Sequence, residues 1–143
     1  MTNREIKSKV MSLGNRLAAN GADRSAAFAK AWAIVKAGGL VLAVKGVTIG
    51  SRQIALKRLT AYEPSQVRAV LVPEPNNPAD PAAIAVMVGV QNGRSLYRLG
   101  YVPREQAAVV KAMGGKLPAL RVVSGTWGLY GKTTYGARIT LAA

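Results

Sequence analysis

Three apolar segments joined by two strong turns lie between Leu71 and Val102, and they constrain the fold more than any other part of the chain. The first segment ends at a proline-rich polar stretch, PEPNNPADP, at residues 73–81. The second segment leads through Gln91-Asn92-Gly93-Arg94 into the third. Asn-Gly is the preferred pair in a two-residue hairpin loop because both positions need a positive φ. The sequence therefore predicts strands joined by a polar turn and then by a hairpin.

Similar segments recur from residue 40 to the end of the chain. The predicted strands cover residues 40–47, 66–72, 82–90, 95–102, 117–123 and 133–141, and the predicted short helices cover 52–59 and 104–113. In strand 95–102, alternation places Leu96 and Arg98 on one face and Tyr97, Leu99 and Tyr101 on the other. Short strands at near-regular spacing are typical of a small barrel, because closure removes exposed sheet edges. We predict a mainly β fold with helices (α+β), containing a small six-stranded β-barrel over residues 40–143, with Ser51 as a helix cap and 124–132 as a long loop.

Residues 1–39 predict a helical hairpin that precedes this domain. Thr2 and Glu5 fit a capping box at the start of the first helix, and Asp23 or Ser25 can cap the second. Gly38-Gly39 stops the second helix, in which we expect Trp32 to be a core residue. The hairpin either only docks on the following domain or, in addition, presents a basic outer face that touches DNA.

Charge narrows the class of partner. The chain has 20 Lys and Arg against 6 Asp and Glu, a formal net charge of +14, and both predicted parts are basic. A small domain this basic usually binds a polyanion. We therefore predict nucleic acid as the partner.

The residue types argue against an enzyme and against a cofactor. The chain has no His and no Cys, and its carboxylates show no spacing that suggests a metal site or an acid–base pair. No apolar run is long enough to cross a membrane, and the charged N-terminal segment lacks the apolar core of a secretion signal. We expect a cytoplasmic, non-enzymatic protein without a metal.

Specific motifs narrow the prediction further. They are Val44-Lys45-Gly46-Val47, Ala55-Leu56-Lys57-Arg58-Leu59, the run VLVPEPNNPADPAAIAV at residues 70–86, and Leu99-Gly100-Tyr101-Val102-Pro103. With these motifs, residues 40–143 resemble the HIRAN domain. The resemblance implies an OB-like six-stranded barrel that binds single-stranded DNA. In the best-understood member, the domain captures a free 3′-hydroxyl end and holds the terminal base between aromatic rings.

The resemblance assigns roles to three residues. Asp80 matches the family aspartate that accepts a hydrogen bond from the 3′-hydroxyl, Tyr101 falls near the nucleotide, and Arg104 matches a basic position that reaches a phosphate. Each has a structural alternative. Asp80 can cap backbone N–H groups in its turn, Tyr101 can be a core residue, and Arg104 can be a solvated surface residue.

The chain also departs from the family pattern. Ala79 stands where a tyrosine is frequent, and Thr48-Ile49-Gly50-Ser51-Arg52 lacks the aromatic residue often found there. Stacking on an aromatic ring contributes about 1–3 kcal/mol per base. Arg52 can replace one ring by guanidinium stacking, and Tyr97, Trp127 or Tyr130 can supply another. The departures weaken the expectation of 3′-end reading more than that of DNA binding.

The cations of the domain are expected to line the approach of the DNA. They are Lys45, Arg52, Lys57, Arg58, Arg98 and Arg104. The alternative function is a protein-interaction module of a phage, mobile-element or DNA-repair system. In that case the N-terminal helices would bind a protein partner or form a homodimer.

Overall fold

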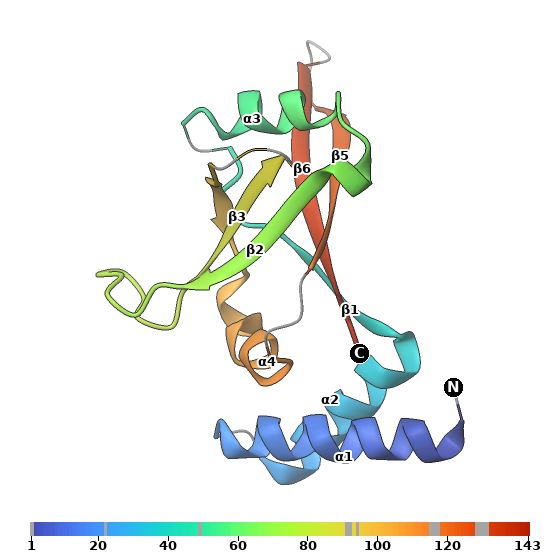
Figure 1. Ribbon diagram of the computed structural model, residues 1–143. Coiled ribbons are helices and arrows are strands. Elements are labelled where there is room, and N and C mark those ends of the chain that lie inside the picture. The colour runs from blue at the N-terminus through green and yellow to red at the C-terminus, as the bar shows by residue number, and fades with distance from the viewer. Residues whose placement is uncertain are drawn as a thin grey trace. The chain divides into compact units, whose positions relative to one another are not determined.

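The computed structural model describes residues 2–143 except 22, 49, 91–92, 94, 115–117 and 128–131 (Figure 1). The chain forms two compact units. The first comprises Met1–Leu40, Glu105–Lys116 and Leu141–Ala143, and the second comprises Val41–Arg104 and Leu117–Thr140. Among the described residues, no helix combines the length and the apolar character that a membrane crossing requires.

The first unit contains α1 (Asn3–Ala19), α2 (Arg24–Ala37) and α4 (Ala107–Ala112), which a 3-10 turn (Arg104–Gln106) precedes. The predicted capping box is confirmed. Thr2 Oγ1 accepts from Glu5 N (3.2 Å), and Glu5 Oε2 accepts from Thr2 N (3.1 Å). The Asp23 carboxylate likewise caps α2 by accepting from Ala26 N (3.2 Å). The N-terminal caps of both helices were therefore predicted correctly from the local sequence.

Small residues set the contact between α1 and α2. A side chain at Gly14 would lie 2.6 Å from the Phe28 ring, so only glycine allows this approach. Ala27 and Ala31 are buried on the facing helix. The prediction that Trp32 is a core residue is wrong. Trp32 follows Ala31 and turns away from this contact, so it stays 42% exposed, with the Lys36 ammonium 5.4 Å from its ring centroid.

The six strands form two three-stranded sheets. One has the order β1-β6-β5, made of β1 (Gly39–Ala43), β6 (Lys132–Ala142) and β5 (Ala119–Trp127). The other has the order β2-β3-β4, made of β2 (Val67–Pro73), β3 (Ile84–Val90) and β4 (Tyr97–Tyr101). The α+β class is confirmed.

The closed six-stranded barrel is not confirmed. In the described part of the chain, the sheets are joined by one isolated bridge, in which Lys45 and Tyr101 exchange backbone hydrogen bonds of 2.8 and 2.9 Å. The predicted strand 40–47 is shorter than expected because β1 ends at Ala43 and Gly46, with φ 79°, turns the chain away. β2 contacts β5 without a hydrogen-bonded register between their described residues, so closure is incomplete.

Two further local predictions are corrected. The expected loop 124–132 is largely strand, because β5 continues to Trp127 and β6 begins at Lys132. Helix α3 (Arg52–Leu59) forms as expected, but Ser51 does not cap it. The Ser51 hydroxyl lies 3.0 Å from the Tyr97 hydroxyl instead. Gln53 anchors α3, because its side chain bonds Val47 O (3.0 Å) and both backbone groups of Tyr135 (2.7 and 2.8 Å).

Candidate nucleic-acid interface

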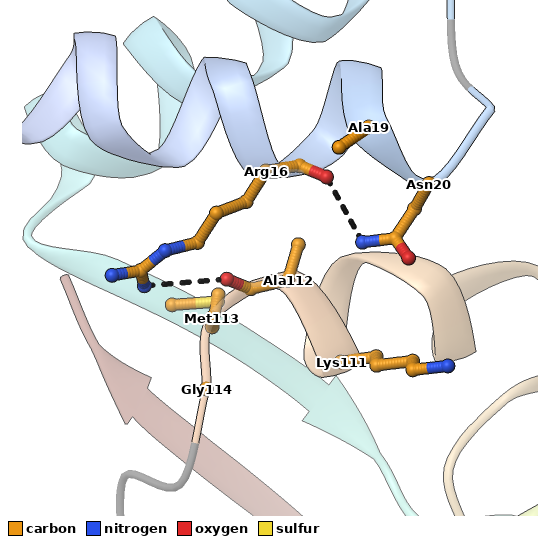
Figure 2. A pocket seen from close by; sticks show the side chains of 7 residues that line it. All are labelled: Arg16, Ala19, Asn20, Lys111, Ala112, Met113 and Gly114. Atoms are coloured by element: carbon orange, nitrogen blue, oxygen red, sulfur yellow. Dashed lines mark hydrogen bonds between the residues drawn. The ribbon is translucent and has the colours of Figure 1, made fainter.

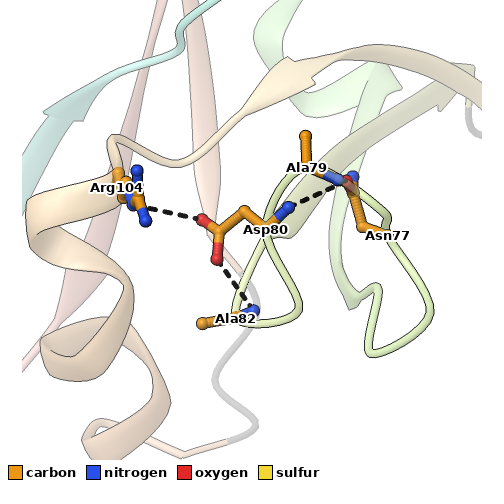
Figure 3. A network of polar contacts seen from close by, with 5 residues as sticks. All are labelled: Asn77, Ala79, Asp80, Ala82 and Arg104. Carbon is orange, nitrogen blue, oxygen red and sulfur yellow. Dashed lines mark hydrogen bonds and ion pairs between the residues drawn. The ribbon is translucent and has the colours of Figure 1, made fainter.

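The polar turn between β2 and β3 is held by its own side chains (Figure 3). Asn77 Oδ1 accepts from Ala79 N (2.9 Å) and from Asp80 N (3.2 Å). Glu74 N donates to Ala83 O (2.9 Å), which closes the base of the turn. Asn77 is therefore a turn-forming residue, and the turn presents Asp80 in a fixed backbone conformation.

Asp80 uses its two carboxylate oxygens differently. Oδ1 accepts from Ala82 N (3.0 Å), which is the structural role offered as its alternative. Oδ2 lies 3.8 Å from Arg104 Nε, too far for a hydrogen bond although close enough for an ion pair. The Asp80 side chain is 22% exposed and that of Arg104 is 83% exposed. A carboxylate oxygen able to accept a further hydrogen bond thus lies beside an exposed cation (Figure 3).

Glu74, which the sequence did not single out, connects this turn to β4. Its Oε2 lies 2.6 Å from Arg98 Nη2, and its Oε1 accepts from Asn77 Nδ2 (3.1 Å). The Tyr101 hydroxyl also donates to this carboxylate. That bond, followed by the bond from Asn77, lowers the pKa of Glu74, and the same bond is the main cause that raises the pKa of Tyr101. The only signal in the sequence was a carboxylate placed directly after a strand.

The predicted faces of β4 are wrong because the strand contains an irregularity. Arg98 pairs with Met87 and Tyr101 pairs with Ala85, with a register shift between Val86 and Met87. Met87 and Ala85 are two residues apart on β3, so their partners Arg98 and Tyr101 share a face. Tyr97 pairs with Val88 and therefore belongs to the opposite face. One extra residue in a strand reverses the alternation beyond it.

We call the side of the β2-β3-β4 sheet that carries Arg98 and Tyr101 the outer face. Its side chains, identified from the register, are Arg68, Val70, Val72, Ala85, Met87, Arg98 and Tyr101. The opposite side carries Ala69, Val86 and Val88, which are buried, so it faces the core. Lys45 joins the outer face because its bridge partner is Tyr101.

The outer face combines cations with partly exposed apolar groups, which surround the buried Ala85. Arg68 and Lys45 are exposed, the Arg98 side chain is 49% exposed, and Val72 is 38% exposed. Like Glu74, Arg68 is a residue of this region that the sequence reasoning did not single out. Simple alternation along the predicted strand 66–72 puts Arg68 on one side with Val70 and Val72, as the register confirms. Such a surface can neutralise phosphates and cover the faces of bases.

The three predicted cations on α3 point in different directions. Arg52 Nη1 donates to Gly46 O (2.7 Å), which holds this guanidinium next to the bridge strand, and its charge acts on the Tyr101 hydroxyl. Lys57 and Arg58 lie in the last turn of α3 and are exposed. A helix advances by about 100° per residue, which puts them about 140° and about 120° around the axis from Arg52. The structure brings Lys45, Arg52 and Arg98 together and leaves Lys57 and Arg58 apart.

The proposed substitutes for the missing aromatic rings are only partly described. Ala79 is exposed and offers no ring. Tyr97 is 38% exposed, but it lies on the opposite side of the sheet from Tyr101 and its hydroxyl contacts Ser51. Tyr130, the side chain of Trp127, and residues 91, 92 and 94 of the predicted hairpin turn lie outside the described part of the chain. The planar groups described next to the polar turn and the bridge strand are therefore the Tyr101 ring and the guanidinium groups of Arg98, Arg104 and Arg52.

The first unit contains a separate groove, at the last turns of α1 and α4 (Figure 2). Its lining residues are Arg16, Ala19, Asn20, Lys111, Ala112, Met113 and Gly114. Arg16 Nη1 donates to Ala112 O (3.5 Å), and Asn20 Nδ2 donates to Arg16 O (2.9 Å). The cation thus neutralises the partial negative charge of a helix C-terminus, so the groove does not resemble an anion site. The described residues contain no group of three side chains that could hold a metal ion.

Comparison with known protein families gives one match. The model of the HIRAN domain matches residues 45–115, which confirms the resemblance over that range. HIRAN is a family of nucleic-acid-binding domains. The matched range contains the polar turn, α3, the outer face and all eight residues predicted for the site. No curated protein and no solved structure matches the chain.

Proposed function

We propose that this protein, which belongs to the HIRAN domain family through residues 45–115, is a non-enzymatic module that binds single-stranded DNA at its 3′-hydroxyl end. The observation that carries the proposal is the Asp80–Arg104 pair. Its carboxylate keeps an oxygen that can accept a hydrogen bond, 3.8 Å from an exposed guanidinium. A terminal nucleotide offers both complementary groups, a hydroxyl donor and a phosphate.

The chemistry of Asp80 favours an end over an internal position. A carboxylate accepts a hydrogen bond from a hydroxyl, whereas it repels the phosphate that replaces that hydroxyl inside a strand. Arg104 would then neutralise the phosphate on the 5′ side of the terminal nucleotide. Because Asp80 Oδ1 is already bonded to Ala82 N, the carboxylate is oriented before the DNA arrives, which limits the entropy lost on binding.

The outer face supports contact with the nucleotides that precede the end. Arg98 and Lys45 flank Tyr101, and Val72 offers an apolar surface nearby. Aliphatic side chains stack less favourably than aromatic rings, and Ala79 replaces one expected ring. The affinity should therefore depend more on phosphate contacts, and so on salt, than in a domain with two stacking rings.

Fluorescence anisotropy with two oligonucleotides tests the proposal. One carries a 3′-hydroxyl and the other a 3′-phosphate, and both carry the label at the 5′ end. We expect tighter binding of the 3′-hydroxyl form. Asp80→Asn should remove most of this preference, because its amide can donate to phosphate while it keeps an oxygen for Ala82 N. Equal affinity of the unmodified protein for both ends would exclude end recognition, and no binding at low salt would exclude the whole proposal.

A second candidate function is protein interaction through the N-terminal helices. It is favoured by the exposure of Met11 (51%) on α1 and Trp32 (42%) on α2. Light scattering coupled to size-exclusion chromatography would report a homodimer, and Trp32→Ala should then shift the protein towards the monomer. A monomer at every concentration, with no change in Trp32→Ala, would exclude self-association.

A further inference from the structure

Two arginines lie directly opposite each other in the second sheet. In the antiparallel register of β5 and β6, Arg121 pairs with Arg138 (Figure 1 shows the two strands side by side). Both are exposed, while the next pair, Leu120 and Ile139, is buried. The two guanidinium groups therefore project from the same outward side of the sheet.

This pairing is electrostatically unfavourable and its neighbours do not relieve it. Like charges directly opposite on a ladder destabilise a sheet. The flanking outward pairs are Ala119 with Thr140 and Val123 with Gly136. None of these is acidic, and within the described residues neither arginine takes part in an ion pair. Positions that break a local rule without compensation in the fold are frequently functional.

The arginine pair lies next to the outer face. Val44 N donates to Ala137 O (2.9 Å), and both residues are buried. Their chain neighbours Lys45 and Arg138 are exposed, because side chains alternate along a strand. Lys45 is in turn the bridge partner of Tyr101. With strands spaced by about 4.8 Å, and with Arg138 two residues further along its strand than the position opposite Lys45, Arg138 is about 12 Å from Tyr101 and Arg121 is about 16 Å away.

We infer that Arg121 and Arg138 form a second phosphate site, which binds the phosphodiester backbone of an internal nucleotide. This rests on the proposed function, since the nucleotide belongs to the strand whose end lies at Asp80 and Tyr101. Two planar guanidinium forks can each donate two hydrogen bonds to one phosphate. A bound phosphate also cancels the repulsion between the arginines. The small flanking residues, Ala119 and Gly136 among them, leave room for the strand to approach.

The distances predict a dependence on strand length. A dinucleotide with a 3′-hydroxyl would reach the end site but not the arginine pair. A strand of about ten nucleotides, within the range covered by one small barrel-type domain, would reach both. Loss of the pair should therefore weaken binding of the longer strand and leave the dinucleotide unaffected.

Anisotropy titrations of Arg121→Gln and Arg138→Gln test this inference, with Lys30→Gln as a control that removes the same charge from α2. We expect each arginine variant to bind the ten-nucleotide strand several-fold more weakly. The slope of log K against log salt should fall by about 0.7, the value for one phosphate on a single strand. Inorganic phosphate, added at equal ionic strength as a competitor, should reduce binding of the unmodified protein more than that of the variants.

The outcomes separate this inference from the proposed function. Arginine variants that match Lys30→Gln in affinity and slope, while the unmodified protein binds the strand, overturn the inference alone. An equal loss for the dinucleotide and the longer strand also overturns it, because the pair would then act through the end site. An unmodified protein that binds neither probe overturns both. Two variants are used so that a folding defect in one does not decide the result.

Discussion

Glu74 Oε2 lies 2.6 Å from Arg98 Nη2, and this ion pair connects the polar turn after β2 to the outer face at β4. The same carboxylate accepts from the Tyr101 hydroxyl and from Asn77, which itself holds the backbone of Asp80. Glu74 thus orients the residue proposed to read the strand end and the residues proposed to flank it. It does so without facing the DNA itself, because only 17% of its side chain is exposed.

Replacing Glu74 by Gln should weaken the connection between the turn and β4, because Gln has nearly the same shape as Glu but no charge. The ion pair with Arg98 is lost, and the bond from Tyr101 becomes a weaker bond to a neutral oxygen. We expect a lower melting temperature and a smaller preference for the 3′-hydroxyl end, because Asp80 and Tyr101 are less well oriented. Glu105→Gln, an exposed residue of the 3-10 turn, removes the same charge as a control. A melting temperature equal to that of the control would contradict the connecting role.

The bond between Glu74 and Tyr101 also predicts a dependence of stability on pH. The pKa of Glu74 is lowered, first by this bond and then by the bond from Asn77, so its contribution is present above the ordinary value of 4.5. That contribution is lost as the pH falls through the lowered pKa of the folded state. The pKa of Tyr101 is raised above 10.0 by the same bond. Its contribution is present below 10.0 and is lost as the pH rises through the raised value.

Spectroscopic titrations measure both pKa shifts. The carboxyl carbon resonance of Glu74 should titrate below pH 4.5, and the difference in ultraviolet absorbance between the protein and Tyr101→Phe should titrate above pH 10.0. In Glu74→Gln the Tyr101 titration should move back towards its ordinary value. A Tyr101 titration that is the same with and without the Glu74 carboxylate would show that another group causes the shift.

Local sequence signals predicted the elements of the fold but not the way the sheets join. The capping box at Thr2, the Asp23 cap and the strands on both sides of the polar turn depend on neighbouring residues, and all were found. Barrel closure depends instead on contacts between distant strands. The isolated bridge at Lys45 and the incomplete pairing of β2 with β5 are of that kind. No periodicity within a segment reports them.

The same distinction applies to the candidate site. Asp80 was singled out by the family resemblance, and its cap on Ala82 N was foreseen as an alternative because the turn is local. The shared face of Arg98 and Tyr101 was missed because it depends on the register shift in β4. Glu74 was missed because its partners Arg98 and Tyr101 lie on a strand distant in the sequence. Alternation assumes a regular strand, and one extra residue reverses it. In β2 the strand is regular, so alternation puts Arg68 on the correct side, although its role was not considered.

The bridge between the sheets depends on a residue without a side chain. A Cβ at Gly100 would collide with Lys45 O, a backbone atom that cannot move aside easily, and with Val44 Cγ1 at 2.7 Å. Gly100→Ala should therefore separate Lys45 from Tyr101 and destabilise the fold by about 1–3 kcal/mol, the usual cost of overpacking. Chemical denaturation measures this change. Gly136→Ala is the matched control, since its Cβ would meet only a Val123 methyl group at 3.3 Å. Equal destabilisation by both substitutions would contradict the argument.

Arg68 distinguishes phosphate contacts on the outer face from end reading. It lies on the same side of β2 as Val70 and Val72, and in the described part of the chain it forms no ion pair. If it neutralises one backbone phosphate, Arg68→Gln should lower the slope of log K against log salt by about 0.7 on single strands. Affinities for strands ending in a 3′-hydroxyl and in a 3′-phosphate should fall by the same factor, unlike the selective effect of Asp80→Asn. Lys30→Gln again controls for net charge. A slope equal to that of this control would remove Arg68 and the adjoining part of the outer face from the DNA path.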